Sequence, residues 1–183
     1  MQPLRSDALR SRKRILDAAR RHDQGALRHN ELAKEAGVGV GTVYRHFPTT
    51  HSLIEALTQD TLERLLAACE TGAARDDPWE GVMDLVDTGL VLLLEDRGLQ
   101  EVLLSHHDDA PEVRSVKESI AASTQTVISR AHKAGVLRAD ITAERLQYLM
   151  CGLEHALRAA PLDDHGALRD VLVAGIRPSQ GSA

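Results

Sequence analysis

Hydrophobic residues recur along most of this chain at spacings of three and four, which is the period of an α-helix. No segment alternates apolar and polar residues over the length of a strand. The pattern therefore predicts an all-α protein of about nine helices. We expect them near residues 7–21, 28–36, 40–47, 50–71, 78–96, 98–105, 111–133, 143–160 and 163–176.

Residues that favour helix ends separate these segments. Gly37 follows the second segment, where glycine enters the left-handed C-cap conformation at least cost. Thr49 or Thr50 can cap the long fourth helix, and Asp77 can cap the fifth. The glycine-containing stretch 70–77 breaks the helical period and is predicted to be a loop.

Composition narrows the class of protein. Aromatic residues make up only 2% of the chain, so we expect an aliphatic core. No apolar run is long enough for a membrane span, and no apolar signal core follows the basic N-terminus. The only two cysteines, Cys69 and Cys151, form neither a disulfide framework nor a zinc-ligand spacing. A cytoplasmic location is expected.

Charge divides the chain in two. Residues 1–50 contain ten Lys and Arg against five Asp and Glu, whereas residues 51–183 contain twelve against twenty-two. The net charges are therefore +5 and −10. A basic head on an acidic body indicates a polyanionic partner for the head, although a solvated basic helix face explains the charge equally well.

Residues 28–47 form a predicted helix, a tight turn at glycine and a second helix. This is the helix-turn-helix arrangement, in which the second helix enters the major groove of DNA. Val43 and Phe47 are expected to face inward. The opposite face then presents groups that bind phosphates and base edges, from Thr42, Tyr44, Arg45 and His46.

The sequence ELAKEAGVGVGTVYRHFP at residues 31–48, with ILDAA at 15–19 and Leu53, resembles the DNA-binding signature of the TetR family of transcriptional regulators. The resemblance implies a DNA-binding domain over residues 1–50, joined by a long helix to a ligand-sensing and dimerisation domain over 51–183. It implies DNA contacts from Arg28, Val40, Gly41, Thr42, Tyr44, Arg45, His46, Thr50 and His51. Thr50 stands where the family usually has lysine.

The resemblance also implies a homodimer whose interface is formed by the last two helices. Their apolar stripes contain Leu146, Leu149, Met150, Leu153, Leu157, Leu168, Val171 and Leu172. A ligand pocket in the body is expected to involve Trp79, Met83, Val86, Leu90, His106, Tyr148 and Cys151, although packing alone also explains the two aromatic residues.

Catalytic and cofactor signals are weak. The glycines of residues 37–41 follow a helix rather than a strand, which argues against a dinucleotide loop. Residues 105–109 offer Ser, His and Asp, but adjacent residues rarely converge on one reacting atom or one ion. We therefore expect no enzyme activity, no cofactor and no metal site.

The sequence thus predicts a ligand-responsive regulator, most simply a repressor that a small molecule releases from double-stranded operator DNA. A helical ligand-binding protein or enzyme that does not bind an operator is the alternative. An architectural DNA-binding protein without a sensor is a third possibility, and it predicts weak sequence preference.

Overall fold

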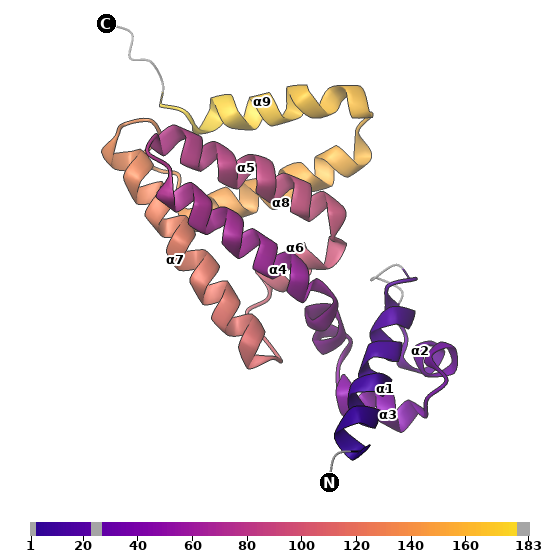
Figure 1. Ribbon diagram of the computed structural model, residues 1–183. Helices are drawn as coiled ribbons and strands as arrows, with labels where there is room; N and C mark the ends of the chain where they lie inside the picture. Colours follow the sequence, from indigo (N-terminus) through magenta and orange to yellow (C-terminus); the bar gives the residue numbers. More distant parts are fainter. Residues whose placement is uncertain (1–2, 23–26, 179–183) are drawn as a thin grey trace, which may run out of the picture. The chain divides into compact units, whose positions relative to one another are not determined.

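The computed structural model describes residues 3–22 and 27–178, which form nine α-helices, one short 3-10 helix and no strand (Figure 1). The predicted all-α fold is confirmed. None of the described helices is long and apolar enough to cross a membrane. The helices are α1 (Pro3–Ala19), α2 (His29–Ala36), α3 (Val40–His46), α4 (Thr50–Ala74), α5 (Pro78–Glu95), α6 (Arg97–Leu104), α7 (Pro111–Lys133), α8 (Ala143–Ala159) and α9 (His165–Ile176), with η2 (Leu162–Asp164) before α9.

Local side-chain and backbone hydrogen bonds define the helix ends. Gly37 has a φ of 60° and donates its N–H to the carbonyls of the last turn of α2, as a left-handed C-cap does. Thr49 caps α4, because its hydroxyl accepts the N–H of Ser52 at 2.9 Å and the Ser52 hydroxyl accepts the N–H of Thr49 at 3.2 Å. Asp77 accepts the N–H of Trp79 at 2.7 Å.

The predicted loop over residues 70–77 is wrong for its first half, because α4 continues to Ala74. Gly72 and Gly81 are buried where α4 and α5 meet. A Cβ at Gly72 would lie 2.9 Å from the carbonyl oxygen of Gly81, and a Cβ at Gly81 would lie 2.5 Å from that of Gly72. Gly72 therefore lies inside α4 and does not end it. Its missing side chain permits the close approach of the backbones of α4 and α5.

The chain divides into two compact units. The first comprises residues 1–60 with 97–114, and the second comprises 61–96 with 115–183. The helix α4 runs without a break through residue 60, at which the first segment of the first unit ends. The predicted domain boundary after residue 50 stays a prediction. In the first unit α1, α2 and α3 pack against one another, and in the second α8 contacts both α5 and α9.

Aliphatic side chains fill the second unit. Leu90, Leu92 and Leu93 in the C-terminal half of α5 are all at most 5% exposed. Arg158 of α8 donates to the carbonyl oxygens of Leu93 and Leu94 and pairs with the buried carboxylate of Glu154. This guanidinium satisfies carbonyl groups at the end of α5 that have no partner within the helix.

Candidate nucleic-acid interface

The helix-turn-helix is built on a small buried core. Leu32 and Ala36 of α2 and Val43 of α3 are almost fully buried, and so is Phe47 directly after α3. The guanidinium of Arg12 on α1 lies over the Phe47 ring, 5.4 Å from its centroid. The inward orientation predicted for Val43 and Phe47 is confirmed, so α1 and α2 fix which face of α3 points outward.

The outward face of α3 carries the side chains predicted to contact DNA. Tyr44 is 51% exposed and Val40 is 42% exposed. Gly41 and Arg45 are exposed, and Thr42 and His46 are half-buried. Arg28 and Thr50, which precede α2 and begin α4, are also exposed. All eight residues are therefore at least partly exposed to solvent.

His29 organises this face, and sequence reasoning missed it. Its buried ring stacks on Tyr44 with centroids 4.6 Å apart and an interplanar angle of 12°. Its Nε2 lies 2.8 Å from the carbonyl oxygen of Phe47, which can only accept, so Nε2 carries the proton. One histidine thus joins the start of α2 to the end of α3 and orients Tyr44.

The electrostatic surroundings of α3 are basic. Partial burial, followed by the charges of Arg12 and Arg45, lowers the pKa of His46 below its ordinary value. The His46 imidazole is therefore neutral at pH 7, and the two arginines supply the positive charge beside it. A neutral imidazole N–H remains able to donate a hydrogen bond to a phosphate oxygen.

Ion pairs connect the end of α1 to α2. The carboxylate of Glu35 lies 2.6 Å from His22 Nε2 and 3.3 Å from a guanidinium nitrogen of Arg21. These two partners, His22 first, hold the pKa of Glu35 below its usual range. The contacts are solvent-exposed and position α1 more than they stabilise it.

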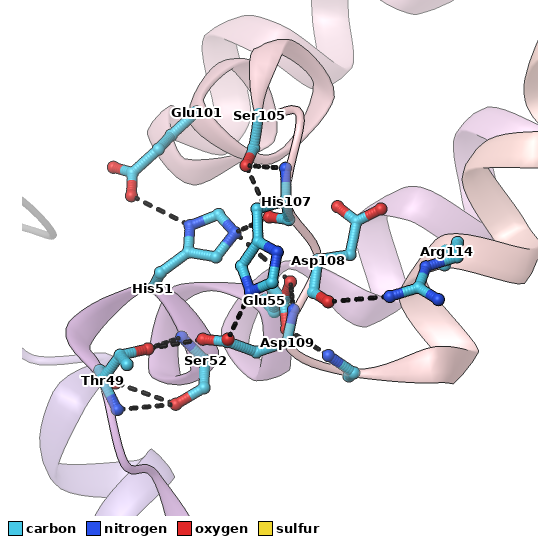
Figure 2. A network of polar contacts seen from close by, with 11 residues as sticks. Thr49, His51, Ser52, Glu55, Glu101, Ser105, His107, Asp108, Asp109 and Arg114 are labelled. Carbon is cyan, nitrogen blue, oxygen red and sulfur yellow. Dashed lines mark hydrogen bonds and ion pairs between the residues drawn. The ribbon is translucent and has the colours of Figure 1, made fainter.

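His51 does not fit its predicted role in DNA binding. Its Nε2 lies 3.0 Å from the carbonyl oxygen of His107, and its Nδ1 lies 3.5 Å from Glu101 (Figure 2). Both ring nitrogens therefore face groups of the protein itself. The hydroxyl of Thr49 likewise donates to Asp109 at 2.5 Å.

The residues predicted for a ligand pocket differ in solvent exposure. Val86, Leu90 and Cys151 are buried in the second unit, and Trp79 and Met83 are half-buried. Burial, then the charge of Glu154, raises the pKa of the Cys151 thiol to about 11. The guanidinium of Arg177 lies 4.0 Å from the centroid of the Trp79 ring.

Two predicted pocket residues lie on the surface. Tyr148 is 51% exposed, and its hydroxyl donates to Glu144 at 3.0 Å on the same helix. His106 is exposed and belongs to the first unit. A role for either residue in lining the interior of the second unit therefore does not fit the structure.

The residues predicted for the dimer interface fall into three groups by burial. Leu146, Met150 and Leu157 are buried within the single chain and contribute to its own core. They cannot supply the main contact area with a second copy. The exposed apolar positions are Leu149 at 42% and Val171 at 72%, and the remaining three, Leu153, Leu168 and Leu172, are half-buried.

Comparison with known proteins gives two family matches. Residues 15–57 match the bacterial regulatory proteins of the tetR family. Residues 77–178 match the C-terminal domain of SbtR-like transcriptional regulators. Among curated proteins, no sequence matches the chain.

Solved structures agree with these matches. A TetR transcription regulatory protein from Mycobacterium vanbaalenii is 27% identical, with 96% of this chain and all of that chain covered and a TM-score of 0.50. A TetR regulator from Streptomyces coelicolor is also 27% identical, with 92% and 99% covered and a TM-score of 0.53. The regulator FadR from Bacillus subtilis, solved with stearoyl-CoA, shares the fold at 14% identity, with 92% and 99% covered and a TM-score of 0.57.

The family resemblance seen in the sequence of α1 to α4 is confirmed. The C-terminal family match alone spans more than half of the chain, and the N-terminal match spans the helix-turn-helix whose outward face is described above. This protein belongs to the TetR family of bacterial transcriptional regulators.

Proposed function

We propose that the protein is a homodimeric repressor that binds operator DNA through α3 and leaves it when a small molecule binds the helical body. The observation that carries the DNA-binding part is the outward face of α3, where Tyr44 is exposed and oriented by its stack on His29. A merely structural hairpin has no need of an oriented tyrosine beside two arginines. The domain division at residue 50 and a cytoplasmic location belong to the same proposal.

Each side chain on this face has a proposed partner. Thr42, Tyr44 and His46 bind backbone phosphates, whereas Val40, Gly41 and Arg45 approach base edges in the major groove. Arg28 and Thr50 flank these groups. Because Thr50 is the first residue of α4, backbone N–H groups of that helix end that the Thr49 cap does not use can replace the phosphate contact of a lysine.

Dimerisation through α8 and α9 brings the α3 helix of a second copy to the DNA. Leu149 and Val171 expose apolar side chains that a second copy would cover, with Leu153, Leu168 and Leu172 beside them. Helix-turn-helix dimers bind half-sites about 34 Å apart, one turn of DNA. The interface therefore sets the spacing of the two α3 helices.

An apolar or amphipathic effector suits the aliphatic body best. Trp79, Met83, Val86 and Leu90 lie on α5, the most apolar helix, and a regulator of the same fold has been solved with stearoyl-CoA. Nearly complete release requires the effector to prefer the released state by about 5.5 kcal/mol. No catalytic step is assigned to the body.

The protein is first used to select fragments of genomic DNA. Fluorescence anisotropy then measures its affinity for a selected fragment, which tests the proposal. Arg45→Ala is compared with Arg64→Ala, because each removes one exposed positive charge and Arg64 pairs with Glu95 in the second unit. We expect the Arg45 variant to lose affinity and base preference by about 1–3 kcal/mol, while the Arg64 variant binds like wild type.

The alternative function makes a different prediction. A helical ligand-binding protein or enzyme without an operator would select no fragment and bind all DNA equally weakly. Equal affinity of both variants for a selected fragment would contradict the role of α3.

A further inference from the structure

A cluster of metal-ligating side chains lies at the beginning of α4. His51 and Glu55 are four residues apart and share one face of α4, and Asp108 comes from the loop between α6 and α7 (Figure 2). One ligand atom from each residue lies within 4.8 Å of the other two. Because all three belong to the first compact unit, their arrangement is part of one body.

The Glu55 carboxylate is buried and held in place. The residue is 1% exposed, and its two oxygens accept the backbone N–H groups of Asp109 and Ala110 at 2.8 and 2.9 Å. Each carboxylate oxygen has two acceptor positions, so these hydrogen bonds leave lone pairs for another partner. Outer hydrogen bonds of this kind orient carboxylate ligands in metal sites.

The His51 ring faces oxygen atoms with both of its nitrogens. Nε2 lies 3.3 Å from Glu55 and 3.0 Å from the carbonyl oxygen of His107, and Nδ1 lies 3.5 Å from Glu101. A neutral imidazole has one N–H and one lone pair, so it cannot donate in both directions. A cation held between the Nε2 lone pair and the oxygens of Glu55 and His107 removes this conflict and leaves the Nδ1 proton directed at Glu101.

Negative charge predominates around the cluster. Carboxylates of Glu55, Glu101, Asp108 and Asp109 gather around it. The nearby guanidinium of Arg114 donates to the backbone carbonyl of Asp108 at 3.3 Å, and the His107 ring lies 3.4 Å from Asp109. A divalent cation between these carboxylates would lower their mutual repulsion.

We propose that His51, Glu55 and Asp108 bind a divalent first-row transition-metal ion, for which Zn²⁺ is the probe. One imidazole and two carboxylates suit zinc, whereas calcium and magnesium prefer oxygen ligands alone. Tetrahedral ligands of zinc stand about 3.4 Å apart, given bond lengths of about 2.1 Å. Small side-chain rotations that draw the three ligand atoms together would therefore complete the site, with water in the fourth position.

The bound ion would tie the first turns of α4 to the loop between α6 and α7. This site does not depend on DNA binding, because all its ligands lie outside α3. The histidines and aspartates of residues 106–109, taken alone in the sequence, predict no metal site. The structure instead brings one aspartate of that loop to two residues of α4.

Zinc titration of the untagged, chelator-treated full chain tests the site, with calorimetry and a competing chromophoric chelator as readouts. We expect one tight site per chain. His51→Gln and Asp108→Asn should each weaken it by about tenfold or more. His106→Gln is the matched control, because it removes an exposed histidine of the same loop, and its zinc affinity should equal that of wild type.

A second measurement uses thermal unfolding. Zinc should raise the unfolding midpoint of wild type and His106→Gln but not of His51→Gln, whereas magnesium should raise none of them. Equal zinc affinity in all four proteins would show binding to scattered surface histidines and overturn the proposal. Absence of a tight site in wild type would also overturn it.

Discussion

Tyr44 combines two roles that a single substitution can separate. Its ring stacks on the buried His29 with centroids 4.6 Å apart, which positions the side chain. The residue is 51% exposed, and we propose that its hydroxyl contacts a phosphate. Tyr44→Phe retains the ring and removes only the hydroxyl, whereas Tyr44→Ala removes both.

The size of the expected effect follows from the charge of the partner. A hydrogen bond to a charged group contributes about 1.5–3 kcal/mol, which corresponds to roughly 10- to 150-fold in affinity for each half-site. Two half-sites in a dimer multiply these factors, so Tyr44→Phe should weaken operator binding by about 10² to 10⁴-fold. The same variant should leave the free energy of unfolding unchanged, because the stack on His29 persists.

Tyr44→Ala should lose DNA binding and also about 0.5–1.5 kcal/mol of stability, the usual contribution of a stacked pair of rings. Anisotropy with the selected operator measures the first effect, and urea unfolding measures the second. Tyr148→Phe is the matched control, because Tyr148 is also 51% exposed but its hydroxyl donates to Glu144 of α8. Wild-type operator affinity in Tyr44→Phe would refute the phosphate contact, and equal destabilisation of both Tyr44 variants would refute the role of the stack.

Two further predictions concern the second unit. Gly81→Ala should destabilise the protein by about 1–3 kcal/mol in urea unfolding, because its Cβ would lie 2.5 Å from the carbonyl oxygen of Gly72. Gly152→Ala, with no atom within 4 Å of its added Cβ, should instead stabilise α8 by up to about 1 kcal/mol, and a reversed order would contradict the close crossing of α4 and α5. Cys69 and Cys151 should not react with a thiol reagent at pH 8 until the protein unfolds, because burial raises both thiol pKa values, that of Cys151 to about 11. Rapid reaction of the native protein at pH 8 would show that these thiols are accessible.

The sequence predicts most of this fold because helix ends are local events. Gly37 and Asp77 end or begin helices through their own backbone and side-chain hydrogen bonds, and these are readable from a few neighbouring residues. The role of Gly72 is not predictable from its sequence neighbours, because it depends on the close approach of Gly81 in the folded state. A glycine that permits close packing cannot be distinguished by local pattern from one that ends a helix.

The candidate sites likewise contain one part that the sequence predicts and other parts that it does not. The outward face of α3 is predictable because its seven residues have helical periodicity and a family signature. The contact of His29 with Phe47 is not, because a histidine beside an apolar stripe has no distinctive spacing. The cluster of His51 and Asp108 is also hidden, since its members are widely separated in sequence and meet only through tertiary folding.

The beginning of α4 connects α3 to the rest of the first unit. Thr49 caps α4 directly after α3 and Pro48, and its hydroxyl also donates to Asp109. The buried Glu55 accepts two backbone N–H groups at the start of α7. Because each loop contact falls within the first two turns of α4, a displaced loop would leave a buried carboxylate without its hydrogen bonds, which is costly. The loop and the start of α4 must therefore move together, and any effector or metal ion that shifts this loop would also shift the helix that carries α3 to DNA.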